Sequence, residues 1–114
     1  MANNPHVLVL LCDQMQACRL GAADEVAHTP FLDDLAGEGT HFTHMISAHG
    51  QYVPSRASFM TGLYTHECGV MVNYGFHGHQ NRISSRQRSL GHVFTDAGYE
   101  TATLRLSTGS LTMW

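Results

Sequence analysis

Three stretches of the chain show the hydrophobic pattern of β-strands. Residues 7–12 are a continuous apolar run with β-branched members, which is typical of a strand buried on both faces of a parallel sheet. Residues 40–47 alternate imperfectly between apolar and polar positions and contain aromatic side chains. Residues 99–104 form a third, shorter stretch of this kind. We therefore expect three strands.

A helix is expected after the first strand and a polar connecting loop at 14–29. Thr29 can cap a helix that begins at Pro30, because threonine accepts from backbone N–H groups and proline suits the first helical position. Gly37 and Gly39 are expected to stop it. The expected apolar stripe of this helix consists of Phe31, Leu32 and Leu35.

Two further helices follow from similar signals. Pro54 is expected to open one that ends near Gly62, and Ser89 is expected to cap another over residues 90–97, terminated by Gly98. Residues between these helices, at 73–88, lack periodicity and predict a surface loop. Strands and helices in this order predict an α/β fold.

Composition narrows the functional classes. The 114 residues are enough for one domain, and the net charge of −3 gives no basic surface for nucleic acid. Neither a spanning apolar segment nor a basic leader is visible, so we expect no membrane partner and a cytoplasmic location. The odd number of cysteines argues against a disulfide framework, and Cys12 is expected to be a buried thiol.

Asp13 directly follows the first expected strand. In open α/β sheets, ligands bind outside the carboxyl ends of the strands, and a carboxylate there can hold Ca²⁺ or Mg²⁺. An aspartate that merely caps the next turn of the loop is the alternative interpretation.

Residues 52–56 lie at the start of an expected helix, where backbone N–H groups and the helix dipole favour an anion. Arg56 could add a forked donor suited to sulfate or phosphate. The alternative is an ordinary solvated arginine. A zinc site could be suspected from the histidines at 41 and 44, at 66, and at 77 and 79. Their spacing does not indicate that three or four of them surround one ion, so we expect them to be ordinary surface histidines.

Several motifs together resemble the N-terminal segment of a sulfatase, in the alkaline phosphatase superfamily. The residues Val-Pro-Ser-Arg-Ala-Ser and the following Thr-Gly are similar to the active-site signature, which reads Cys or Ser, any residue, Pro-Ser-Arg. The resemblance covers nearly the whole chain in the family's order, through the segments 5–14, 28–39, 42–43, 53–66 and 89–102.

This resemblance implies a sulfatase-like sandwich with a mostly parallel central sheet and flanking helices, present here in incomplete form. It implies metal-dependent hydrolysis of small sulfate esters, with Ca²⁺, or alternatively Mg²⁺ or Mn²⁺, as the divalent metal. Asp13 would be the first metal ligand and Gln14 a second. Arg56 would steady the formylglycine nucleophile, which forms by oxidation of a cysteine or serine.

The chain departs from the family pattern in three ways. Tyr52 occupies the nucleophile position, where a phenol cannot be converted to formylglycine. The sequence contains no lysine, so the family's pocket lysines are missing, and residues 105–114 form a divergent tail after a sulfatase-like part at 1–104. The chain is also much shorter than whole sulfatases. We therefore expect a truncated, inactive segment, produced by a natural truncation or a frameshift. The alternative is a pseudoenzyme or a remnant that binds a partner or metal.

Overall fold

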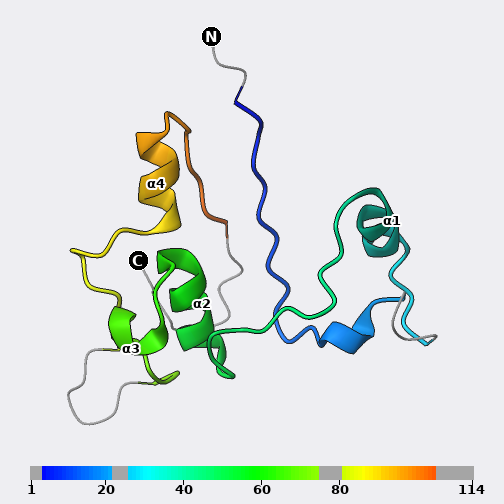
Figure 1. Ribbon diagram of the computed structural model, residues 1–114, viewed down its shortest axis with the longest axis horizontal. Coiled ribbons are helices and arrows are strands. Elements are labelled where there is room, and N and C mark those ends of the chain that lie inside the picture. The colour runs from blue at the N-terminus through cyan, green and yellow to red at the C-terminus, as the bar shows by residue number, and fades with distance from the viewer. Residues whose placement is uncertain (1–3, 22–25, 75–80, 105–114) are drawn as a thin grey trace. The chain divides into compact units, whose positions relative to one another are not determined.

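The computed structural model describes residues 4–21, 26–74 and 81–104 (Figure 1). The chain divides into two compact units, Met1–His44 and Met45–Trp114, which are described separately below. None of the described helices is long and apolar enough to cross a lipid bilayer.

The first unit contains a short 3₁₀ helix, η1 at Ala17–Arg19, and the helix α1 at Pro30–Glu38. The hydroxyl of Thr29 accepts a hydrogen bond from the N–H of Gly21 at 2.8 Å and donates to the carboxylate of Asp33, 3.2 Å from Oδ2. Thr29 thus precedes α1 as predicted, but the expected side-chain cap is wrong. Its side chain instead ties the preceding loop to the first turn.

Helix α1 ends one residue before Gly39, whose N–H donates to the carbonyl of Leu35 at 3.0 Å. Gly37 lies inside the helix, so the expectation that it helps to stop the helix is wrong. The outer part of the predicted apolar stripe has no cover, since Phe31 is 86 % exposed and Leu35 is 62 % exposed. Helix α1 therefore contributes no buried residue to a core in the described part of the chain.

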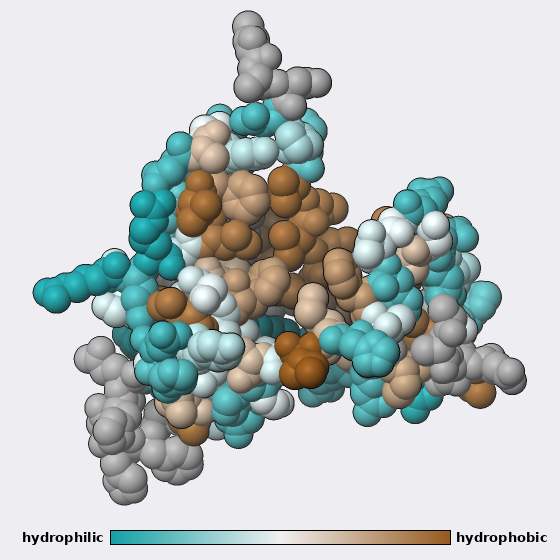
Figure 2. Space-filling view, viewed as in Figure 1, coloured by the Kyte–Doolittle hydropathy of each residue, from teal (hydrophilic) through white to brown (hydrophobic). Residues whose placement is uncertain are grey.

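Residues 7–12 run in an extended conformation without forming a strand. All of them are exposed, and Figure 2 shows brown, hydrophobic atoms at the surface where Figure 1 draws this segment. The expected burial on both faces is wrong, and so is the expected burial of the Cys12 thiol. A strand needs hydrogen bonds to a neighbouring strand, and the described part of the chain contains no such pairing. The strands expected at 40–47 and 99–104 are absent for the same reason.

The described residues of the second unit form three helices: α2 at Tyr52–Thr61, α3 at Thr65–Cys68 and α4 at Leu90–Asp96. Helix α2 contacts both α3 and α4. The core of this unit is small and apolar, and consists of Val53, Ala57, Cys68 and Val70, with Leu63 and Ile83 packed against it. The structure therefore confirms the predicted helices, whereas the short helix α3 was not predicted.

Helices α2 and α3 each end at a glycine with left-handed backbone. Gly62 ends α2 with a φ of 71°, and its N–H donates to the carbonyl of Ser58 at 2.8 Å. Gly69 ends α3 with a φ of 77°. Glycine adopts this conformation without the steric cost that a Cβ imposes. Gly62 thus ends α2 sharply before the chain enters α3, which contacts α2.

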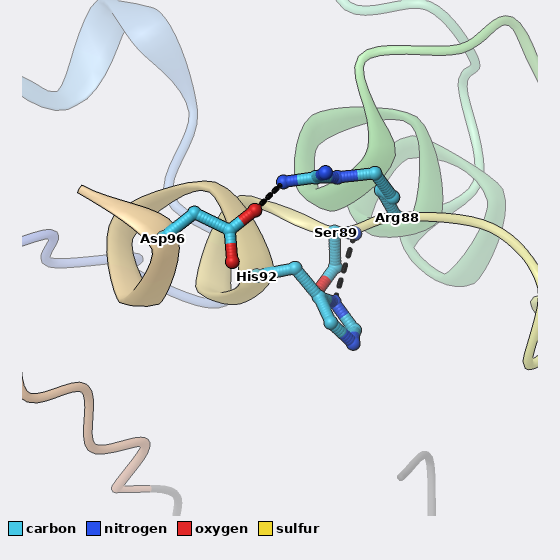
Figure 3. A network of polar contacts seen from close by, with 4 residues as sticks. All are labelled: Arg88, Ser89, His92 and Asp96. Atoms are coloured by element: carbon cyan, nitrogen blue, oxygen red, sulfur yellow. Dashed lines mark hydrogen bonds and ion pairs between the residues drawn. The ribbon is translucent and has the colours of Figure 1, made fainter. Parts of the chain in front are cut away.

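Helix α4 begins with a reciprocal contact between Ser89 and His92 (Figure 3). The N–H of Ser89 donates to Nδ1 of His92 at 3.1 Å, and the hydroxyl of Ser89 lies 2.8 Å from the same nitrogen. Arg88, which precedes the cap, forms an exposed ion pair with Asp96, the last residue of α4. The predicted cap at Ser89 is confirmed, and exposed ion pairs such as this one contribute little to stability.

Candidate active site

Tyr52 is the first residue of α2, two positions before the proline at which the helix was expected to begin. Arg56 follows one turn later and lies on the same side of the helix. The guanidinium carbon of Arg56 lies 5.5 Å from the centroid of the Tyr52 ring. The structure therefore brings these two predicted site residues together, with Tyr52 40 % exposed and Arg56 half-buried.

The backbone donors at the start of α2 are largely used within the protein. The N–H of Val53 donates to Oδ1 of Asn73 at 3.1 Å, and the N–H of Ser55 donates to the carbonyl of Gln51 at 3.1 Å. Pro54 has no N–H at all. An anion at this helix end would compete with Asn73 for its donor, so the backbone is less suited to sulfate than the sequence suggested.

Asn73 was missed by sequence reasoning, although it lies at the expected site. Its own N–H donates to Oε1 of Gln51 at 3.2 Å, so Asn73 contacts the residues on both sides of Tyr52. An asparagine in an aperiodic polar stretch carries no signal of this role, because its partners lie twenty or more positions earlier.

Asp13 and Gln14 lie at the end of the extended segment of the first unit, and both are exposed. Gln14 has a φ of 56°, in the left-handed region that non-glycine residues seldom occupy. Tyr52 and Arg56, in contrast, belong to the second unit. The expectation that Asp13 follows a strand is wrong for the described residues, because residues 7–12 form no strand.

The described residues do not assemble a metal site. They contain no group of three or more His, Cys, Asp or Glu side chains placed to hold an ion. The oxygen donors of Asp13 and Gln14 suit Ca²⁺ chemically, but calcium takes about six to eight oxygen ligands. His44 contacts the hydroxyl of Thr43 at 2.9 Å, and the histidines at 77 and 79 lie outside the described residues. The two expected ligands alone therefore do not fit a calcium centre.

A further polar group of the signature is buried in α2. Ser58 is 7 % exposed, and within the described part of the chain its hydroxyl has no hydrogen-bond partner. It lies on the helix face that also buries Pro54 and Ala57, away from the exposed edge that carries Tyr52. Its position assigns it to the packing of the second unit.

Comparison with known proteins identifies the family. The sequence profile of the sulfatase family matches residues 5–110. An ulvan-active sulfatase of Formosa agariphila is 33 % identical over 99 residues, covering 86 % of this chain and 18 % of that protein. An arylsulfatase of Clostridium perfringens is 30 % identical, over 85 % of this chain and 19 % of that protein. A steryl-sulfatase of Mus musculus is 29 % identical, over 86 % of this chain and 17 % of that protein.

The matched relatives are all named as sulfatases, which are enzymes that hydrolyse sulfate esters. The chain belongs to the sulfatase family, as the resemblance of its motifs predicted. It spans about a fifth of the length of the curated relatives it matches. The family indicates an alkaline phosphatase-like α/β fold, whereas the described part of this chain contains helices only. No solved structure matches the chain.

Proposed function

We propose that this chain is a non-catalytic sulfatase-family segment in which Tyr52 occupies the position of the formylglycine nucleophile. One observation carries the proposal: Tyr52 is the first residue of α2, and the Arg56 guanidinium lies over its ring. In the family resemblance, this arginine would steady the nucleophile. Here it contacts the face of an aromatic ring instead.

The chemistry of the side chain supports the proposal. Formylglycine forms when a thiol or hydroxyl on a Cβ methylene is oxidised to an aldehyde, and the Cβ of a tyrosine carries a ring instead. A phenol is almost fully protonated at neutral pH, which makes it a poor nucleophile without an activating base. Removing the nucleophile of an enzyme typically costs several orders of magnitude in rate. We therefore propose sulfate-ester hydrolysis as the ancestral reaction, not the reaction of this chain.

A mostly parallel central sheet of the sulfatase type is part of the proposal for the whole domain. The exposed apolar residues at 7–12 support it, since this run is typical of a central strand. Asp13 and Gln14 would then supply two oxygens towards a divalent cation such as Ca²⁺ at the end of that strand. Because the described donors do not complete such a site, the proposal includes no metal-dependent step.

An arylsulfate hydrolysis assay tests the proposal. The chain is compared with Tyr52→Phe, which keeps the ring and removes the phenolic oxygen, the atom of residue 52 that could attack sulfur. We expect both to release no phenol above the rate without protein. Hydrolysis by the chain that Tyr52→Phe abolishes would overturn the proposal and identify Tyr52 as a nucleophile.

A second arm tests the position of the nucleophile. Tyr52→Cys is coexpressed with a formylglycine-generating enzyme, with Tyr52→Ala as the control. We expect mass spectrometry to show conversion of the new cysteine to an aldehyde and no change in the alanine variant, because the following Pro-Ser-Arg is intact. An unconverted cysteine would contradict the assignment of position 52.

A further inference from the structure

We infer that Asn73 is a positioning residue for position 52. Its Oδ1 accepts from the N–H of Val53 at 3.1 Å, and its N–H donates to Oε1 of Gln51 at 3.2 Å. One residue of a distant segment therefore binds both chain neighbours of Tyr52. The inference goes beyond the proposed function, because it concerns where residue 52 points and not what its side chain can do.

The local sequence at the start of α2 creates the need for such a partner. The first N–H groups of a helix have no acceptor within the helix. Val53 is only 2 % exposed, so water is a poor substitute for a protein acceptor, and leaving this buried donor unpaired would be destabilising. Gln51 precedes the helix, makes no side-chain cap with it, and is not among the preferred capping residues. Asn73 therefore acts as the N-cap that Gln51 does not provide.

The core holds Asn73 in place. Val70, three residues earlier, is fully buried, and its N–H donates to the carbonyl of Thr65 at 3.1 Å. The segment that follows α3 is thereby anchored against α2, and Asn73 extends from that anchor to the helix start. The bond to the Val53 N–H holds the backbone on one side of residue 52, and the bond to the Gln51 side chain holds the residue on the other side. Together they restrict the direction of the Cα–Cβ bond of residue 52, whatever side chain it carries.

Amide exchange of Val53, measured by NMR on the full chain, tests this role. Asn73→Ala removes the acceptor, and we expect the Val53 amide to exchange about tenfold faster, which corresponds to roughly 1.4 kcal/mol. Asn73→Asp restores an acceptor and adds a charge that the helix N-terminus favours, so it should return exchange to the native rate or below. The ring resonances of Tyr52 should shift in the alanine variant and recover in the aspartate variant.

Gln87→Ala is the matched control. The Gln87 side chain also bridges two segments of the second unit, donating to the carbonyl of Glu67 at 3.0 Å and accepting from the N–H of Ser84 at 3.2 Å. Both of these partners lie outside α2. We expect it to leave the Val53 amide and the Tyr52 ring unchanged. Equal effects of Asn73→Ala and Gln87→Ala would overturn the inference, as would an aspartate variant that exchanges as fast as the alanine variant.

If Asn73→Ala does not fold, two other variants at position 73 are compared by helical circular dichroism. Asn73→Leu keeps the approximate volume without an acceptor, whereas Asn73→Asp keeps the acceptor. Recovery of the helical circular dichroism by Asn73→Asp alone supports the positioning role. Recovery by both variants, or by neither, contradicts it.

Discussion

The guanidinium carbon of Arg56 lies 5.5 Å from the centre of the Tyr52 ring. The two residues are one helical turn apart in α2. A cation over an aromatic face is attracted by the negative potential of the ring, and at exposed sites the attraction is about 0.5–1 kcal/mol. Residue 52 is therefore coupled to the arginine of the signature by its aromatic face.

A double-mutant cycle measures this coupling. Tyr52→Leu and Arg56→Gln are made singly and together, and free energies of unfolding are obtained from urea titrations. We expect a coupling free energy of about 0.5 kcal/mol, because leucine keeps apolar volume but presents no π-face. Tyr52→Phe should retain most of the coupling. A coupling free energy of zero would show that the two side chains are adjacent without stabilising each other.

The buried hydroxyl of Ser58 leads to a prediction of opposite sign from most core substitutions. Ser58→Ala removes a polar group that has no hydrogen-bond partner within the described part of the chain and replaces it with a better helix former. We expect the free energy of unfolding to rise by about 0.5–1 kcal/mol. Denaturant titration of the two proteins is sufficient to measure it.

Thr61 supplies the control for Ser58. Its hydroxyl lies on the same helix and donates to the carbonyl of Ala57 at 2.8 Å. Thr61→Val keeps the shape and loses this bond, so we expect a loss of about 0.5–1 kcal/mol. A destabilising Ser58→Ala comparable to Thr61→Val would mean that Ser58 has a partner in the folded chain.

What could be predicted from the sequence depended on the range of the interactions. The start of α4 at Ser89 and the end of α2 at Gly62 depend on only a few adjacent residues, and the structure confirms both predictions. Helix α3 escaped prediction because its four residues are too few to show a period. Asn73 escaped because its partners lie in another part of the sequence.

The expected strands failed for a related reason. An apolar run such as 7–12 indicates only that these side chains favour burial between other elements of the fold. The run becomes a β-strand only when its backbone forms hydrogen bonds to a neighbouring strand. The described part of the chain provides none, so the run stays extended and exposed. The family signature, by contrast, was readable because it is local. Residues 52–56 lie on one helix, and Tyr52 and Arg56 meet as the spacing suggests.

The left-handed backbone at Gly62 gives a prediction about the end of α2. Gly62→Ala places a Cβ at a φ of 71°, and we expect a loss of about 1 kcal/mol from strain although the surroundings are open. Gly91→Ala, within α4, meets only the hydroxyl of Ser89 at an ordinary contact distance, and it should be neutral or stabilising because alanine favours helix. Urea titrations of both variants check the pair. Equal losses would argue against a special backbone at Gly62.

Gly21 gives a different kind of glycine prediction, since its φ is not left-handed. A methyl group at this position would overlap Oδ2 of Asp33, the carboxylate that accepts from the hydroxyl of Thr29. Gly21→Ala must therefore displace Asp33 and weaken the contact between the loop and α1, at an expected cost of about 1 kcal/mol. Amide exchange of α1 measures this loss locally.

Gly21→Ala in an Asp33→Ala background distinguishes two causes of the loss. One is overlap of the new methyl group with the Asp33 carboxylate, and the other is a general disturbance of the loop. With the carboxylate gone, the added methyl group has space, so Gly21→Ala should have little further effect on amide exchange in α1. The two substitutions are then non-additive by about the cost of the single Gly21→Ala change, as expected for residues in direct contact. Additive losses would mean that Gly21 is required for the loop itself, independently of Asp33.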